Sequence, residues 1–264
     1  RLLLDLDQKT VNPTFGYAFS HDTAGRTGTP FSVYAQELAR HTLNAAVELV
    51  LDAATTLTLS FDVNVERGDQ KKPYRMLPIF DARVAIEIPR GASLALVNER
   101  RSPGRMTERT PLERNRFALS SRFARRFGGS TFLLSDRLYA DDWGLFAFTT
   151  DARYVADVGR RLYAWLHFRG HLQSGVSFWR RAYAGSVGDG SSDQPEYRTG
   201  DRELSPLATL TGGAGVRWNF GALPRPSRWG LSVQGDAMVT HFRDALYVRE
   251  RVGQLFVVQM ETEL

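Results

Sequence analysis

The chain of 264 residues contains no cysteine, which excludes disulfide bonds, thiolate metal ligands and cysteine nucleophiles together. It also lacks an uninterrupted apolar run near the ~18 residues that a membrane-spanning helix needs. A bundle of membrane helices is therefore excluded. A β-barrel is not, because barrel strands are only half apolar and hydrophobic residues make up 42% of this chain.

Motifs for catalysis are also scarce. The chain has no GxSxG elbow, no HExxH motif and no phosphate-binding glycine loop. His167 and His171 share a face of an expected strand, but at about 3.3 Å per residue they lie ~13 Å apart, too far for one ion. The pairs His21 with Asp22 and Asp141 with Asp142 have no recognisable nucleophile beside them. We therefore predict a protein that is not an enzyme, with no cofactor and no metal.

Strict alternation is what the sequence does have. In residues 56–67, Leu57, Leu59 and Phe61 alternate with Thr58 and Ser60, and the pattern continues to Arg67. Successive side chains of a strand point to opposite faces, so this segment has one apolar and one polar face. In a soluble sandwich the apolar face would form the core, whereas in a membrane barrel it would meet lipid and the polar face a wet lumen.

The same pattern recurs along the chain. Further strands are expected at residues 43–51, 82–88, 94–96, 117–123, 132–138, 146–154, 162–173, 209–220, 229–240 and 256–264. Many segments run to about 9 to 13 residues, close to the length that crosses a bilayer at a tilt. Short turns are expected at "DAAT", "PRG", "RFGG", "ADVG" and "GALPRPS", and long polar loops at residues 22–40, 67–80, 101–113 and 174–205. Short turns alternating with long loops favour an outer-membrane barrel over a sandwich.

The two faces then have distinct roles in this interpretation. The polar phase supplies charges of both signs that we expect to line the lumen: Glu48, Asp62, Glu66, Arg83, Glu87, Arg116, Arg122, Arg137, Asp151, Arg153, His167, Arg169, His171, Arg217 and Asp236. Aromatic residues near the short turns are expected to form an interfacial girdle: Phe127, Tyr154, Trp218, Phe220 and Trp229. Asp136 and Arg125 fall on the lipid phase, where a charge requires a bulge or a position at the membrane edge.

Four segments resemble an uncharacterised family of bacterial outer-membrane proteins, a domain-of-unknown-function family common in proteobacteria and myxobacteria. They are "FSHDTAGRTGTPFSVY", "ERGDQKKPYR", "RLYADDWG" and "YRTGDRELSPL", in this order and spacing. The resemblance implies a barrel fold and an outer-membrane location, and it implies no activity. Members of the family look longer at the N-terminus.

We therefore expect an all-β protein, an antiparallel transmembrane β-barrel of about 12 to 16 strands with short periplasmic turns and long extracellular loops. Residues 1–264 are expected to form a single barrel domain of the bacterial outer membrane, with further strands before residue 1. Lipids, lipopolysaccharide and other envelope proteins are the expected partners, and nucleic acid is not.

Three functions are compatible with the sequence. The first is a porin-like channel or passive transport pore, biased toward anions by its lumen arginines. The second is a non-conducting barrel that serves as a structural or anchoring subunit of an envelope complex. The third is a soluble basic β-protein that binds nucleic acid, for which the net charge of +5 is the only support because the basic residues are dispersed.

Overall fold

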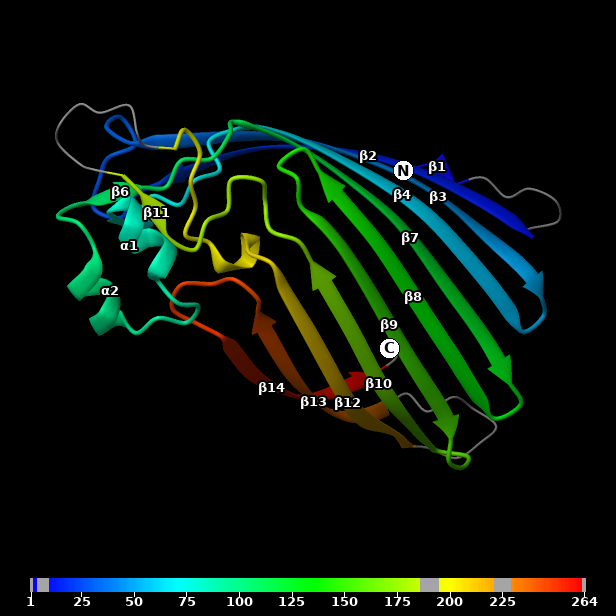
Figure 1. The fold of residues 1–264 in the computed structure, drawn as a ribbon. Helices are drawn as coiled ribbons and strands as arrows, with labels where there is room; N and C mark the ends of the chain where they lie inside the picture. Colours follow the sequence, from blue (N-terminus) through cyan, green and yellow to red (C-terminus); the bar gives the residue numbers. More distant parts are fainter. Residues whose placement is uncertain (1, 4–9, 186–194, 221–228, 263–264) are drawn as a thin grey trace.

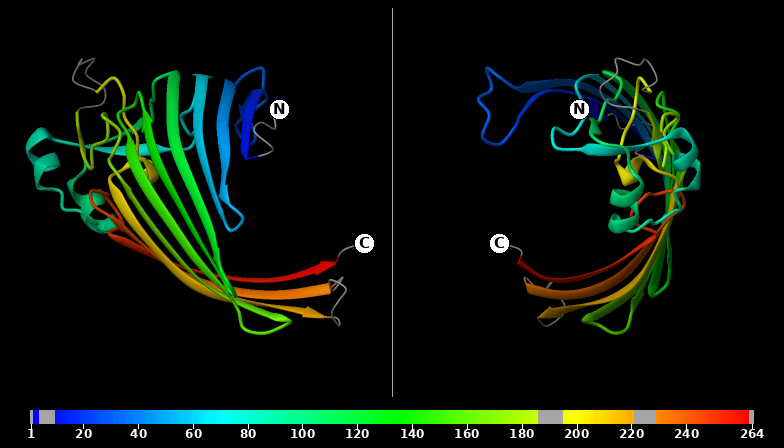
Figure 2. Two further views of the ribbon diagram at one scale, coloured as in Figure 1. Left: turned by 90° about the vertical axis from the view of Figure 1, so that its right-hand side faces the viewer. Right: turned by 60° about the vertical axis from the view of Figure 1, so that its left-hand side comes forward.

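The computed structural model describes residues 2–3, 10–185, 195–220 and 229–262. One antiparallel sheet of eleven strands forms most of it, in the order β1-β2-β3-β4-β7-β8-β9-β10-β12-β13-β14 (Figure 1). Its strands are β1 (Leu2–Leu3), β2 (Val11–Gly25), β3 (Ala35–Asp52), β4 (Thr55–Gly68), β7 (Glu113–Phe127), β8 (Ser130–Asp141), β9 (Phe146–Asp157), β10 (Leu162–Gln173), β12 (Leu207–Phe220), β13 (Trp229–Phe242) and β14 (Glu250–Thr262). The sheet is strongly curved, with β1 and β14 as its edges (Figure 2).

The connections differ sharply between the two ends of this sheet. At one end, β3 joins β4 through residues 53–54, β7 joins β8 through residues 128–129, and β9 joins β10 through residues 158–161. Gly128 has a φ of 54°, a left-handed conformation that glycine adopts without strain and that a two-residue hairpin requires. Three of the five expected short turns are thus confirmed, and the expected turn at residues 221–227 lies outside the described residues.

The other end carries the long connections, residues 69–112 between β4 and β7 and residues 174–206 between β10 and β12. They contain β5 (Met76–Phe80), α1 (Ala82–Glu87), α2 (Leu94–Arg100), β6 (Arg105–Thr107), β11 (Tyr183–Ala184) and the 3-10 helix η2 (Arg202–Leu204). A second sheet joins the two connections, because β11 pairs with β5 in parallel and β5 pairs with β6 in antiparallel fashion. We call these connections, together with residues 243–249, the cap.

The prediction of strands at residues 82–88 and 94–96 was wrong, because these residues form α1 and α2. Each helix has a side-chain N-cap: Asp81 accepts a hydrogen bond from the backbone N–H of Arg83, and Ser93 from that of Leu96. Short apolar segments fit either period, and here the helical one prevails since Val84 and Ala85 pack on the core of Phe80, Ile88, Ala92 and Val97. "PRG" is accordingly no hairpin turn.

The cap lies on the concave side of the sheet at its loop end (Figure 2). Gln173 of β10 donates hydrogen bonds to the backbone carbonyls of Glu203 and Ser205 in the cap, 2.8 Å each. The polar face that carries Gln173 is therefore the concave one, which we call the inner face, and the apolar phase forms the convex outer face. Within the described residues, no helix is long and apolar enough to cross a membrane.

Candidate functional site: the inner face and its cap

Most of the predicted lumen residues share the inner face of the large sheet. The strand registers place them there together: Glu48, Asp62, Glu66, Arg116, Arg122, Arg137, Asp151, Arg153, His167, Arg169, His171, Arg217 and Asp236. Arg83 and Glu87 are the exceptions, because they lie on α1 in the cap and not on a strand of the sheet. Their assignment to the lumen was wrong for the same reason as the strand assignment.

Glu66 is the most enclosed charge of the inner face, with 1% of its surface exposed. Its carboxylate bridges two arginines of the neighbouring strands, Arg40 Nε at 2.8 Å and Arg116 Nη2 at 2.7 Å. A buried carboxylate with two cationic partners is satisfied electrostatically. These charges therefore hold three strands together and attract few further ions.

His167 lies at the centre of a second network. Its two ring nitrogens face Asp236 at 3.0 Å and Asp151 at 3.1 Å. Gly213 makes room for this arrangement, because a Cβ there would clash with the Asp236 carboxylate. His171 has separate partners, Thr149 at 2.7 Å and Gln173 at 3.2 Å. The glycines of "GGAG" thus permit close packing inside a strand, as Gly in strands often does.

A polar groove of about 400 Å³ opens on the inner face between β4 and β10. Three exposed arginines line it, Arg122 from β7, Arg137 from β8 and Arg169 from β10. Two of the arginines are in long ion pairs, Arg137 with Asp62 at 3.6 Å and Arg169 with Asp151 at 3.7 Å. Arg122 forms no ion pair within the described part of the chain. Two aspartates, Asp136 and Asp151, also line the groove, together with the hydroxyl-bearing residues Thr58, Ser60, Ser120, Ser121, Ser135 and Thr149.

The outer face carries the five aromatic residues that were predicted to form a girdle. Its members Phe127, Tyr154, Trp218, Phe220 and Trp229 are 41 to 53% exposed and lie on the outer face near the short turns. Trp218 and Phe220 stack with ring centres 5.4 Å apart. Amphipathic and aromatic side chains at one height of an apolar surface are typical of a membrane interface.

A second aromatic row lies toward the cap and was not predicted. Pairing across the sheet aligns Tyr17, Leu43, Val63, Phe117, Ala140 and Phe146 in one row of the outer face. Phe117 and Phe127 are ten residues apart on β7, and at ~3.3 Å per residue and a tilt of about 40° they are separated by ~25 Å in height. This matches the apolar band of an outer-membrane barrel, about 25 Å tall. Only the strand registers reveal this row, since Phe117 and Tyr17 have no common sequence signal.

Two charged residues, Arg125 and Asp136, lie on the outer face of the sheet. Arg125 lies near the short turn between β7 and β8, with its guanidinium carbon 5.2 Å from the ring centre of Phe127, and its position at the membrane edge stays a prediction. Asp136 lies midway along β8 between Ser121 and Thr150. The register between β7 and β8 runs without a shift from Arg116 to Phe127, so no bulge explains Asp136.

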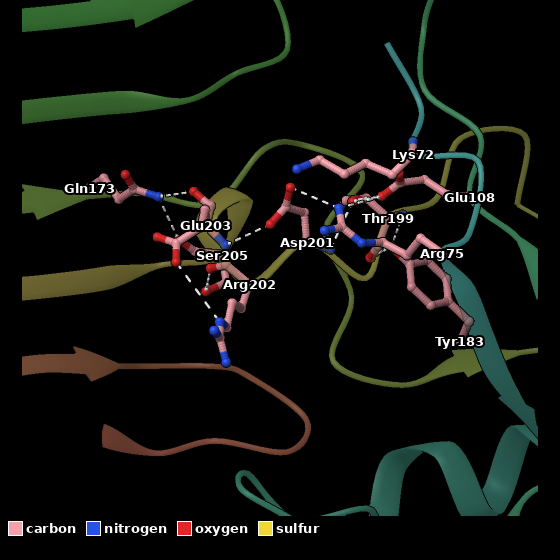
Figure 3. Close-up of polar contacts among 10 residues, drawn as sticks. All are labelled: Lys72, Arg75, Glu108, Gln173, Tyr183, Thr199, Asp201, Arg202, Glu203 and Ser205. Atoms are coloured by element: carbon pink, nitrogen blue, oxygen red, sulfur yellow. Dashed lines mark hydrogen bonds and ion pairs between the residues drawn. The ribbon is translucent and has the colours of Figure 1, made fainter. Parts of the chain in front are cut away.

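The cap is held by a buried polar cluster (Figure 3). Glu108, 3% exposed, accepts hydrogen bonds from Thr199 Oγ1 at 2.5 Å and from the backbone N–H of Lys72 at 2.7 Å, and pairs with Arg75 at 3.1 Å. Arg75 also pairs with Asp201 at 2.7 Å.

The surroundings of this cluster shift two pKa values. Burial alone lowers the pKa of Arg75, but its hydrogen bonds and charge interactions with Asp201 and Glu108 together raise it above the ordinary value. Burial raises the pKa of Tyr183, whose hydroxyl donates to carbonyls in this cluster.

Neither pair considered for catalysis forms a catalytic arrangement: the residues of one pair point apart, and those of the other make structural contacts. His21 and Asp22 are adjacent on β2 and therefore point to opposite faces. Asp141 is buried in an ion pair with Arg114, 2.5 Å, and Asp142 accepts a hydrogen bond from the side-chain amide of Asn115 at 2.7 Å. Trp143 stacks on the Arg114 guanidinium, which further fixes this rim.

These features define a class of protein: an all-β wall with an apolar convex face, a charged concave face and a folded cap at the loop end. Residues 10–234 match the family described as "Protein of unknown function (DUF3570)", so the chain belongs to this family. The resemblance to a family of unknown function is thereby confirmed. No curated protein sequence matches the chain.

Two solved structures are similar in their fold. OmpT, an outer membrane protein of Vibrio cholerae, has 8% identity and a TM-score of 0.48, covering 98% of this chain and 62% of its own. The siderophore receptor PiuA from Acinetobacter baumannii has 12% identity and a TM-score of 0.34, covering 96% of this chain and 42% of its own. The chain thus spans less than two thirds of either protein, and its fold assignment rests on the strand pairing and not on these similarities.

Proposed function

We propose that this chain forms the wall of a bacterial outer-membrane β-barrel whose lumen conducts small anions. The outer face supports the membrane location, because its large side chains are apolar and exposed, and Phe117 and Phe127 at the two ends of β7 are ~25 Å apart in height. On this proposal the outer face contacts lipid, and the cap lies on the lipopolysaccharide side, since long loops of such barrels face outward.

The single observation that carries anion conduction is the groove with Arg122, Arg137 and Arg169. Two other arginines of the inner face are more closely paired, Arg116 with Glu66 at 2.7 Å and Arg217 with Glu261 at 2.5 Å. The three groove arginines are exposed; Arg137 and Arg169 are in long ion pairs of 3.6 and 3.7 Å, and Arg122 has no ion pair among the described residues. Cationic side chains in a confined aqueous passage raise the local anion concentration, and rings of Arg or Lys select anions in pores.

Single-channel recording of the full-length protein in planar bilayers tests this function. We expect discrete conductance steps and a reversal potential, in a KCl gradient, that favours chloride. Replacing Arg122, Arg137 and Arg169 together by Gln should shift the reversal potential toward the non-selective value. Arg125→Gln is the matched control, because it removes the same charge from β7 on the outer face.

The outcomes separate the candidates. A folded and inserted protein that gives no steps would overturn the proposal, with a heat-modifiable gel band as the control for folding. Conductance with unaltered selectivity in the triple variant would reject the role of the three arginines.

A second function has its own observation. The cap covers the loop end of the inner face and is joined to it through Gln173, which favours a closed barrel that anchors another envelope protein. A silent, folded protein that cross-links to a partner through residues of the cap would support this function over the pore.

A further inference from the structure

A cavity of about 450 Å³ lies in the cap where three connections meet. Met76 and Pro78 come from β5, Trp179 and Arg180 from the connection before β12, and Tyr247 from the loop between β13 and β14. Pockets for small molecules have volumes of about 300 to 1,000 Å³ and combine apolar walls with a few polar groups. The cap cavity meets both criteria, and it is separate from the groove of the inner face.

The apolar wall of the cavity is incompletely covered. Met76 is 47% exposed and Tyr247 is 51% exposed, although both belong to an otherwise well-packed cap. Trp179 is held in place because its indole N–H donates to the carbonyl of Asp244 at 2.9 Å. A fixed indole beside exposed Met and Tyr side chains offers a preformed surface for an apolar group.

Cations dominate the polar wall. Arg75 and Arg181 are neutralised by carboxylates, the latter by Asp244 at 2.7 Å, and Arg202 lies 3.8 Å from Glu203. Two further cations, Lys72 and Arg180, form no ion pair with any described carboxylate. Among the described residues, the Arg180 guanidinium donates to the carbonyls of Ser177 and Trp179, within its own loop. The cavity thus has spare positive charge next to an exposed apolar surface.

We propose that the cap cavity binds a small amphipathic anion, a molecule with a flat apolar body and a phosphate or carboxylate group. The apolar body would contact Met76, Trp179 and Tyr247, and the anionic group would pair with Lys72 and Arg180. Guanidinium groups suit phosphate and carboxylate because they present several donors in a planar fork. This site goes beyond the proposed conduction, because binding here requires no open lumen.

Isothermal titration calorimetry of the full-length protein in lipid nanodiscs tests the site with three probes. Phenyl phosphate carries both features, inorganic phosphate lacks the apolar body, and benzyl alcohol lacks the charge. We expect phenyl phosphate to bind saturably at one site, about tenfold or more tightly than either of the other probes. Equal affinity for phenyl phosphate and inorganic phosphate would overturn the proposed apolar contact, and no binding by folded protein would overturn the site.

Variants locate the site. Arg180→Gln and Lys72→Gln should each weaken phenyl phosphate binding by about tenfold, since each removes a charge-assisted contact. Arg109→Gln is the matched control, an exposed arginine of the cap that does not line the cavity. Equal losses in the control and in Arg180→Gln would overturn the assignment. Loss of binding in the triple lumen variant would place the site on the inner face and likewise overturn it, while conductance is measured separately.

Discussion

In the cap, Ile79, Phe80 and Val97 are at most 1% exposed, whereas on the sheet Phe168 and Val233 are more than 40% exposed and Glu66 is enclosed. The cap therefore hides apolar side chains, as a soluble protein does. The sheet instead exposes apolar side chains on its convex face, and its charged side chains lie mainly on the concave face. One chain contains both arrangements, joined at the loop end of the sheet.

This difference agrees with the proposal that the sheet lies in a membrane and the cap in water. Burial of apolar area stabilises the cap against water. Exposure of the apolar outer face to water would not stabilise the sheet. Its inner face is stabilised by ion pairs and hydrogen bonds between strands. Substitutions of the same kind should therefore have different effects in the two regions, as the following predictions state.

The largest effect is expected for Phe80→Ala in the cap. Removing a fully buried phenyl group leaves a cavity and should cost about 3 to 5 kcal/mol of local stability. Hydrogen exchange of the protein in nanodiscs should show faster exchange in residues 76–107 and unchanged protection of β7 to β10. Equal loss of protection in the sheet would mean that the two regions unfold as one unit.

Glu66→Gln should destabilise the sheet by about 3 kcal/mol, because it removes the enclosed carboxylate and leaves Arg40 and Arg116 facing each other. Glu261→Gln is the matched control. Glu261 also pairs with an arginine, Arg217, but its side chain is 41% exposed, so we expect a loss of about 1 kcal/mol or less. Urea unfolding in lipid vesicles measures both, and similar losses would contradict the importance of burial here.

Phe168→Arg tests the lipid exposure of the outer face. A cation near the middle of the apolar band should cost about 2 to 4 kcal/mol in vesicles. Val257→Arg is the control on the inner face of β14, where Val257 is 39% exposed and pairs with Gln234. Its cost should be much smaller, and a similar cost for both variants in the same unfolding assay would argue against a membrane at the outer face.

The smallest of these effects is expected for Gly215→Ala. A Cβ at Gly215 would clash with the indole of Trp165, and overpacking of this kind costs about 1 to 3 kcal/mol. Gly212→Ala is the matched control on the same strand, because nothing lies within 4 Å of a Cβ there. The melting temperatures of the two variants, read from the heat-modifiable gel band, should differ, with Gly215→Ala the lower.

Much of the sheet could be predicted from local patterns. The alternation of Leu57, Leu59 and Phe61 with Thr58 and Ser60 is confirmed as two faces of β4, because the side-chain period of a strand is a property of the backbone. The turns at Gly128 and at residues 53–54 also follow from local conformation. The candidate site was predicted as a set of inner-face charges, but not which of them pair.

The sequence by itself thus determined the two faces of the strands, three of the short turns and the outer-face position of Trp218 and Trp229. Only the tertiary structure decided that residues 82–87 and 94–100 are helical, that two distant connections join through β5 and β11, and that Arg122, Arg137 and Arg169 line one groove. The physical reason is the separation in sequence of the residues that interact. Strand period and turn conformation depend on neighbours in the chain, whereas short apolar segments and charges acquire their structure and partners from residues far away in sequence.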